Sequence, residues 1–283
     1  MRIEARAKIN WALNVTGTRP DGRHDLDMLT QRLGLADTLT IEHARRLTLE
    51  VSGAPGLSAG DDNLALRAAR LLKEATGYAK GARMRLQKKI PLQAGLGGGS
   101  ADAAAALTGL NGLWKTGLLP RDLARLGALL GSDVPLCLCP GLARVRGAGE
   151  DVRPLSGGRE WHLVLLKPEE GLSTRAVFEA YDRGAPPEAA DIERAAEALL
   201  SGDMGEAARH CRNQLQEAAA RMLPAVGRAV DALTAQGAAF ARMTGSGSAV
   251  FGVFESGMAA AAAQAALMND WPVCLAVRTL GDR

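Results

Sequence analysis

The chain has 283 residues, 47% of them hydrophobic, and its formal net charge is +3. This length allows one large domain or two of ordinary size, with room for real hydrophobic cores. The slight positive charge includes no run of Lys or Arg, so it gives no reason to expect nucleic-acid binding and suits an anionic small molecule equally well. No apolar segment is long enough to span a bilayer or to form a signal peptide, which predicts a cytoplasmic protein with no membrane partner.

The four cysteines do not form the evenly spaced framework of a disulfide-rich secreted protein. Cys137 and Cys139 lie in an apolar stretch with no histidine nearby, whereas a tetrahedral metal site needs further nitrogen or sulfur ligands. We therefore interpret the cysteines as buried thiols of a reducing compartment, and we assign no residue to a metal site.

The first segment of the chain alternates between apolar and polar residues from Ile3 to Val15. A period of two over this length predicts a half-buried strand, on which Lys8 and Asn10 project from the same face. The same reasoning, with cap signals before helices, predicts strands at 28–35, 38–42, 47–51 and 82–90, and helices that begin after Asn63, directly after residue 102, at Arg121 and near Val134.

A polar, flexible stretch at 154–160 predicts a domain boundary, so we divide the chain into residues 1–155 and 156–283. The order of elements beyond it, a strand, helices, a pair of strands, a helix and a last strand, is typical of a ferredoxin-like split βαβ unit. The predicted elements are strands at 162–167, 238–243, 249–254 and 272–277, and helices at 188–200, 207–220, 224–236 and 258–267.

The strongest local signal is a glycine-rich segment, Gly95–Asp102, between a predicted strand and a predicted helix. Four glycines in five positions cost conformational entropy, and they are tolerated where a backbone takes left-handed dihedrals or approaches a ligand closely. Unpaired N–H groups at a helix N-terminus also attract anions. We therefore predict a phosphate-binding loop, in which the Ser100 hydroxyl adds a hydrogen bond or approaches a Mg²⁺ ion.

Three common nucleotide motifs do not fit this segment. A Walker A loop ends in Gly-Lys-Ser/Thr, and no lysine occurs between Pro91 and Lys115. A dinucleotide-binding fingerprint requires glycine at the position of Ser100, and the catalytic triplets of protein kinases are absent from the sequence. A purely structural glycine loop is the remaining alternative.

Two ionisable residues are candidates for acid–base chemistry, although each has a structural alternative. Asp133 is followed by Val-Pro in an apolar neighbourhood, where an unpaired carboxylate is costly. It would be either the N-cap of a following helix or a functional group. Lys8 is open to the same two interpretations, because a single lysine on the polar face of a strand is usually solvated.

Four segments in this order resemble the GHMP kinases, the superfamily of galactokinase, homoserine kinase and mevalonate kinase: 7–10, 91–102, 131–135 and 244–248. The resemblance covers essentially the whole chain. It implies an α+β fold of two domains, an N-terminal domain like domain 2 of ribosomal protein S5 and a C-terminal ferredoxin-like domain. It also implies a kinase that uses ATP and Mg²⁺ and acts on an alcohol of a small molecule.

Further segments are similar to the GHMP kinases that phosphorylate the 2-hydroxyl of 4-diphosphocytidyl-2-C-methyl-D-erythritol in the non-mevalonate route to isoprenoids: 21–24, 62–64, 147–150 and 172–174. That resemblance implies a general base at Asp133 and, beside it, Lys8, which orients the hydroxyl and offsets developing charge. It implies contacts to the cytidine diphosphate substrate from Asn10, His24, Thr174 and Phe178, with His24 at the cytosine edge and Phe178 stacked on the ring. It implies contacts to ATP from Asn63, Leu64, Lys88, Pro91, Leu92, Gln93, Ala94, Gly95, Leu96, Gly97, Gly98, Gly99, Ser100 and Ala101.

The sequence departs from that pattern at four positions, of which Leu136 and Cys137 stand where aromatic residues are frequent and affect packing only. Arg23 stands where these relatives commonly carry a tyrosine that stacks on cytosine, and an arginine could replace the ring through a cation–π contact or bind the diphosphate. Ala101 replaces a second serine, which leaves Ser100 to supply the hydroxyl at the end of the loop.

Several alternatives stay open at this point. If His24 and Phe178 do not contact the substrate, His24 has a structural role and Phe178 belongs to the core. If the protein does not act on the cytidyl substrate, it is another GHMP kinase of the homoserine or mevalonate type, or a nucleotide-binding module without turnover. No apolar stripe in the sequence indicates an oligomer interface.

Overall fold

Two β-sheets and the helices that pack on them form the structure, a computed structural model that describes residues 1–281. The first sheet has the strand order β3-β4-β2-β5-β6, with β1 additionally paired along β2. All of its pairs are antiparallel except β3–β4. The elements of this part are β1 (Arg2–Thr18), β2 (His24–Ala44), β3 (Thr48–Ser52), α1 (Leu64–Thr76), β4 (Gly81–Gln87), α2 (Gly98–Trp114), α3 (Pro120–Leu130), α4 (Val134–Cys137), β5 (Leu142–Gly147) and β6 (Asp151–Leu155).

The second sheet is antiparallel and has the strand order β10-β7-β9-β8. Its chain order, a strand, helices, two strands, a helix and a strand, is that of a ferredoxin-like unit, so the predicted two-domain α+β fold is confirmed. The elements of this part are β7 (His162–Lys167), α5 (Thr174–Asp182), α6 (Ile192–Ser201), α7 (Met204–His210), α8 (Gln216–Met222), α9 (Ala225–Ala235), β8 (Phe240–Met243), β9 (Val250–Phe254), α10 (Gly257–Leu267) and β10 (Val273–Arg278).

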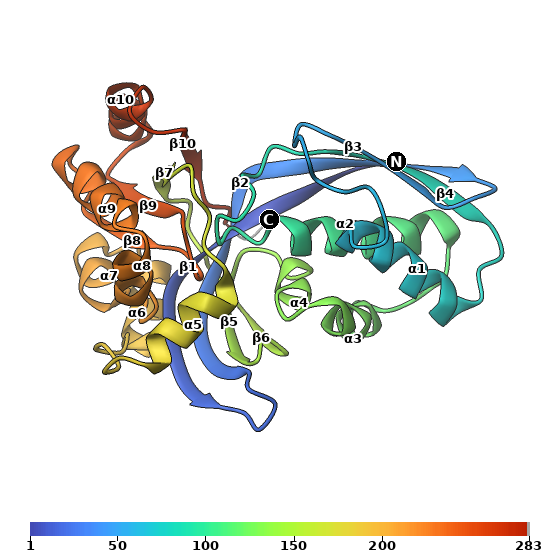
Figure 1. Ribbon diagram of the computed structural model, residues 1–283, viewed down its shortest axis with the longest axis horizontal. Helices are drawn as coiled ribbons and strands as arrows, with labels where there is room; N and C mark the ends of the chain where they lie inside the picture. The colour runs from blue at the N-terminus through green and yellow to red at the C-terminus, as the bar shows by residue number, and fades with distance from the viewer. Residues whose placement is uncertain (282–283) are drawn as a thin grey trace.

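The long strands β1 and β2 connect the two parts, and Figure 1 shows them curving from the first sheet past the helices of the second. Residues 7–14 of β1 are all buried, so the prediction of a half-buried strand is wrong. The apolar face packs in a core that includes Trp11 and residues of β7 and β9. The polar face is covered as well, because a Cβ atom at Gly97 would lie 3.1 Å from Lys8 Cγ and the Asn10 side chain donates to Met28 Sδ at 3.3 Å. The edge of the strand is also occupied, since the Lys8 N–H donates to Leu96 O at 3.0 Å and the Asn10 N–H donates to Thr244 Oγ1 at 2.9 Å.

The predicted helix at 207–220 is two helices, α7 and α8, with a break between them. Asn213 explains the break, because its side-chain amide donates to the carbonyl oxygens of Met243 and Gly245 at 2.8 Å each. The same residue forms a bridge to Leu13 of β1. The chain leaves the helical path here in order to join β1 to the loop between β8 and β9.

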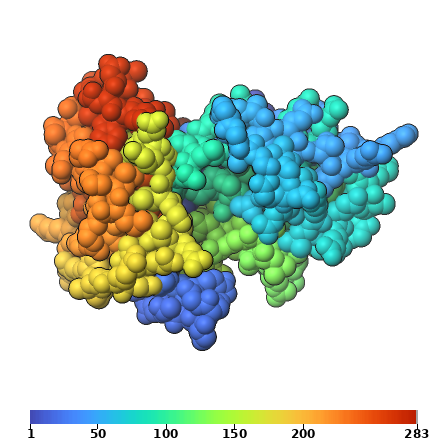
Figure 2. Space-filling model, in the orientation of Figure 1, coloured from blue at the N-terminus to red at the C-terminus, as the bar shows by residue number. Residues whose placement is uncertain are grey.

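The two parts lie side by side in Figure 2, with the tip of the β1–β2 hairpin, in dark blue, emerging beneath α5. The predicted boundary at residues 155 and 156 falls in the connection between β6 and β7. It stays a prediction, since β1 and β2 pack against both parts. Every helix within residues 1–281 is too short or too polar to traverse a lipid bilayer.

Candidate active site

A cavity of about 460 Å³ opens where the glycine-rich loop, β1, the loop before α4 and the loop between β8 and β9 meet. Both parts of the chain supply its walls, and most of the predicted site residues line it together. The lining residues are Lys8, Asn10, Leu13, Leu26, Met28, Leu64, Lys88, residues 90–100, residues 131–133, Thr174, Phe178, Leu215, Gly245 and Ser246.

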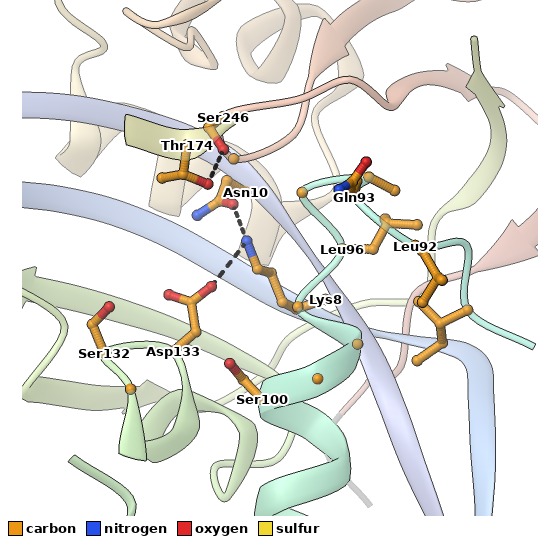
Figure 3. A pocket seen from close by; sticks show the side chains of 18 of the residues that line it. Lys8, Asn10, Leu92, Gln93, Leu96, Ser100, Ser132, Asp133, Thr174 and Ser246 are labelled. Atoms are coloured by element: carbon orange, nitrogen blue, oxygen red, sulfur yellow. Dashed lines mark hydrogen bonds and ion pairs between the residues drawn. The ribbon is translucent and has the colours of Figure 1, made fainter. Parts of the chain in front are cut away.

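The glycine-rich loop leads directly into α2, which begins at Gly98 rather than after residue 102. Gly97 occupies the N-cap position and has no side chain to accept a hydrogen bond, so the first N–H groups of the helix are left for another acceptor. The helix dipole favours an anion at this end. Figure 3 shows the Ser100 side chain at the same end, among the residues that line the cavity.

Two of the glycines are required by the space around them. Gly95 has φ +73°, and a Cβ atom there would lie 2.2 Å from the carbonyl oxygen of Thr244. Gly97 has φ +69°, and a Cβ atom there would lie 3.1 Å from Lys8 Cγ. The loop therefore packs tightly between β1 and the second part of the chain, in backbone conformations that other residues rarely adopt.

An ammonium and a carboxylate meet at the cavity. Lys8 Nζ donates to Asn10 Oδ1 at 2.7 Å and lies 3.6 Å from Asp133 Oδ2, as Figure 3 shows. The Lys8 side chain is 4% exposed, so it is not a solvated lysine. Asp133 stands at the N-cap position of α4, but its side chain makes no capping hydrogen bond and is 36% exposed. Capping therefore does not account for this carboxylate.

The second part of the chain contributes hydroxyl groups on the other side of the cavity. Thr174, at the start of α5, and Ser246, in the loop between β8 and β9, have their hydroxyl oxygens 2.8 Å apart. Figure 3 places both near Asn10, whose side-chain amide also donates to Met28 Sδ at 3.3 Å. Polar groups from three distant segments thus surround the space next to Lys8.

His24 and Phe178 form a stacked pair at the edge of the site. Their ring centroids are 4.5 Å apart with an interplanar angle of 19°, and His24 Nε2 lies 2.9 Å from Asp182 Oδ1. Phe178 lines the cavity. His24 is not among the lining residues and contacts one of them, Phe178. The neighbouring Arg23 is 64% exposed and pairs with Asp21 Oδ2 at 2.7 Å.

Lys88 lines the cavity, and its ammonium is buried between two carboxylates. Nζ lies 2.5 Å from Asp102 Oδ2 and also bonds Asp37 Oδ2, and Asp37 Oδ1 accepts the N–H groups of Lys89 and Ile90. Burial raises the pKa of Asp102 to about 7, and its Oδ1 has no hydrogen-bond partner among residues 1–281. The ammonium of Lys88 is thus committed to this triad, and its contact with ATP stays a prediction.

Asn63 and Ala101 adjoin residues that line the cavity. The Asn63 side chain caps α1 by accepting the Ala65 N–H at 3.0 Å, and it donates to Ser58 O at 2.7 Å. Ala101 directly follows Ser100 and is buried. Their contacts with ATP also stay predictions.

Sequence reasoning assigned no role to several residues of this region, among them Ser132, Ser246 and Asp37. Ser132 and Ser246 line the cavity inside segments that the sequence had singled out as motifs, although neither was assigned a role. Asp37 anchors Lys88 beneath the loop, and its signal was the lone charge among the mostly apolar residues from Leu33 to Leu39. A charge in such a run must find a partner when it is buried.

Comparison with protein-family models identifies both halves of the chain. Residues 63–141 match the GHMP kinases N terminal domain, and residues 195–273 match the GHMP kinases C terminal model. The 4-diphosphocytidyl-2-C-methyl-D-erythritol kinase of Moorella thermoacetica is 44% identical over 284 residues, which cover 99% of each chain.

Solved structures agree with this match. A crystal structure of 4-(cytidine 5'-diphospho)-2C-methyl-D-erythritol kinase has a TM-score of 0.86 and 35% identity, covering 100% of both chains. A mevalonate kinase from Methanococcus jannaschii covers 99% of this chain and 98% of its own, with a TM-score of 0.74, but at 13% identity it shares the fold alone. The resemblance seen in the motifs is thus confirmed, and the chain belongs to the GHMP kinases and, within them, to the 4-diphosphocytidyl-2-C-methyl-D-erythritol kinase family.

Proposed function

We propose that this kinase transfers the γ-phosphoryl group of ATP to the 2-hydroxyl of 4-diphosphocytidyl-2-C-methyl-D-erythritol, with Asp133 as the general base. Relatives at 44% and 35% identity carry that substrate in their names. The observation that supports the proposal most directly is the position of Lys8 Nζ, 3.6 Å from Asp133 Oδ2 in a cavity at the N-terminus of α2.

In the proposed step the substrate hydroxyl oxygen forms a bond to the γ-phosphorus while the bond from that phosphorus to the β,γ-bridging oxygen breaks. ADP leaves, and the hydroxyl proton passes to the Asp133 carboxylate. Lys8, held in place by Asn10, orients the hydroxyl and offsets the charge that develops. The transition state of phosphoryl transfer is loose, so positioning and electrostatics supply most of the acceleration.

The phosphates of ATP would lie against the bare N–H groups at the start of α2 and along residues 91–101, with Asn63, Leu64 and Lys88 toward the adenosine. Within residues 1–281 there is no cluster of three or more His, Cys, Asp or Glu side chains that could hold a metal ion. In this proposal the ATP phosphates and the Ser100 hydroxyl, which lines the same cavity, would hold Mg²⁺. Bound there, Mg²⁺ would neutralise part of the phosphate charge.

The cytidyl substrate would occupy the opposite side of the cavity, with contacts from Asn10, His24, Thr174 and Phe178. Three of these residues line the cavity, and His24 stacks on Phe178. The substrate alcohol would then lie between Thr174 and the Lys8–Asp133 pair.

The substitution Asp133→Asn tests the role of the base. It keeps the shape of the side chain but cannot accept a proton at neutral pH. Turnover with ATP and the cytidyl substrate should fall about a hundredfold or more, while the Kd for ADP changes less than about twofold. Asp231→Asn, which removes an exposed carboxylate on α9, is the matched control and should keep full activity.

A panel of acceptor alcohols tests the substrate, with ADP formation as the readout. We expect turnover with 4-diphosphocytidyl-2-C-methyl-D-erythritol and not with mevalonate or homoserine. Turnover with either of those two in place of the cytidyl compound would refute the substrate assignment, and nucleotide binding without turnover on any acceptor would make the protein a binding module. Near-normal turnover of Asp133→Asn would refute the base assignment alone.

A further inference from the structure

Arg32 lies on β2 directly across from Lys8 on β1. Its guanidinium donates through Nη1 to the carbonyl oxygen of Cys137 and, at 3.4 Å, to that of Cys139. Its backbone N–H donates to the carbonyl oxygen of Gly141 at 3.2 Å. One residue therefore holds three carbonyl groups in the segment at the end of α4 and just after it.

The short helix α4 links this anchor to the candidate base. Asp133 stands at its N-cap position, and the Asp133 carbonyl oxygen accepts the Cys137 N–H at 3.3 Å. The Cys137 carbonyl, at the other end of the same turn, is bonded by Arg32. A single helical turn has little stability of its own, so its placement depends on contacts of this kind.

The charge of Arg32 is balanced by carbonyl groups rather than by a carboxylate. It forms no ion pair with any residue in 1–281, and burial lowers its pKa. A buried charge without a counter-ion is costly unless hydrogen bonds compensate it. Here charge-assisted bonds from Nη1 to the carbonyl groups of Cys137, the last residue of α4, and of Cys139 provide part of that compensation, whereas Nε has no hydrogen-bond partner among residues 1–281.

We propose that Arg32 is a positioning residue of this kinase, which holds α4 so that the Asp133 carboxylate stays beside Lys8 and the acceptor hydroxyl. The inference rests on the proposed role of Asp133 as the base. Since Lys8 and Arg32 are partners in one strand pair, the same two strands fix both members of the Lys8–Asp133 couple. A displacement of α4 would move the Asp133 carboxylate away from Lys8, since Asp133 stands at the N-cap position of that helix.

A double-mutant cycle tests the proposal, with kcat and KM measured for ATP and 4-diphosphocytidyl-2-C-methyl-D-erythritol. Arg32→Met keeps an unbranched side chain and removes the donors, so kcat should fall about tenfold while the KM for ATP changes less than about twofold. In the Asp133→Asn background the same change should lower kcat less than about twofold, because Asp133 no longer accepts the proton. Arg32→Lys, which restores a charge and a donor, should recover most of the lost kcat.

Arg242→Met is the matched control. Arg242 is also largely buried and donates to the carbonyl oxygens of Ala208 and Cys211, but it holds the end of α7. We expect it to lower the midpoint of thermal unfolding while kcat stays within about twofold of wild type. An equal loss of kcat in this control would assign the effect of Arg32→Met to lost stability and overturn the proposal.

The outcomes separate this proposal from the proposed function. Full activity of Asp133→Asn would refute the base and leave no carboxylate for Arg32 to position. A large loss in Asp133→Asn together with a normal kcat in Arg32→Met would refute the positioning role alone. Additive losses in the double variant would also refute it, because independent effects add. If Arg32→Met does not fold, the same cycle is run with Arg32→Lys, for which a smaller loss of kcat should again vanish in the Asp133→Asn background.

Discussion

Arg23 occupies the position at which the cytidyl-substrate kinases commonly carry a stacking tyrosine. It directly precedes His24, whose ring stacks on Phe178, and its own side chain is 64% exposed beside Asp21. The guanidinium plane is thus free to move toward a base that lies near Phe178, at the cost of an exposed ion pair. Exposed pairs of this kind contribute little to stability, because water screens them.

The substitution Arg23→Tyr should strengthen binding of the cytidyl substrate. Stacking of an aromatic ring on a base contributes about 1–3 kcal/mol, whereas a cation–π contact at an exposed site contributes about 0.5–1 kcal/mol. We expect the KM for the cytidyl substrate to fall about fivefold and the KM for ATP to stay constant. Arg23→Ala is the control and should raise the KM for the cytidyl substrate; no change in either variant would mean that residue 23 faces solvent in the complex.

Single residues show where reasoning from the sequence ended. The chemistry of Lys8 and Asp133 was ambiguous by itself, because an isolated lysine or aspartate has an ordinary structural explanation. Only the resemblance to a family brought the two together, and the 3.6 Å contact between them depends on a tertiary arrangement that no local pattern encodes. Arg32 gave no signal at all, since its partners are backbone carbonyl groups.

At the scale of the element, periodicity predicted most strands and helices of both parts. It failed where the environment of an element comes from elsewhere in the chain. Strand β1 alternates in sequence but is buried on both faces, because residues of β7 and β9 pack on one face and Gly97 of the glycine-rich loop lies against the Lys8 side chain on the other. Strands β5 and β6 were missed because they are short and interrupted by charged residues, and their pairing with β2 and with each other is not visible in the sequence.

Helix α2 carries a buried charge near its N-terminus that should make stability depend on pH. Burial raises the pKa of Asp102 from 3.8 in its ordinary state to about 7. Between these values the folded protein holds a proton that the unfolded chain has released, so this group lowers stability as pH rises from about 4 to about 7. Because Asp37 already balances Lys88, the second carboxylate is the one that takes up the proton.

The substitution Asp102→Asn removes this titration. The unfolding free energy of wild type should fall between pH 5 and pH 8 by about 2 kcal/mol more than that of the variant. Urea denaturation of both proteins at the two pH values measures this difference. Asp37→Asn is the contrasting control, because it deprives Lys88 and two backbone N–H groups of their acceptor and should cost about 3–5 kcal/mol at both pH values. An equal wild-type-to-variant difference at pH 5 and pH 8 would show that Asp102 does not titrate in this range.

At the scale of the whole molecule, the nucleotide loop is held by the second part of the chain as much as by the first. The N–H groups of Ser248 and Ala249 donate to the carbonyl oxygens of Gln93 and Ala94 at 3.4 and 3.2 Å. Gly95 lies so close to Thr244 that no side chain fits between them. A ligand that orders the loop should therefore stabilise both parts together.

Binding of ADP tests this coupling. At a concentration of about 100 times its Kd, ADP should add about 2.7 kcal/mol to the free energy of unfolding and raise the midpoint of thermal unfolding by about 5 °C in a single transition. Hydrogen exchange should slow in residues 244–248 as well as in 93–100, because the two loops are bonded to each other. Asp133→Asn should show the same shift, since its carboxylate faces the acceptor alcohol in the proposed mechanism. Two separate transitions, with the one from residues 162–278 unmoved by ADP, would contradict the coupling and would make the second part of the chain a neighbour of the nucleotide site rather than one of its walls.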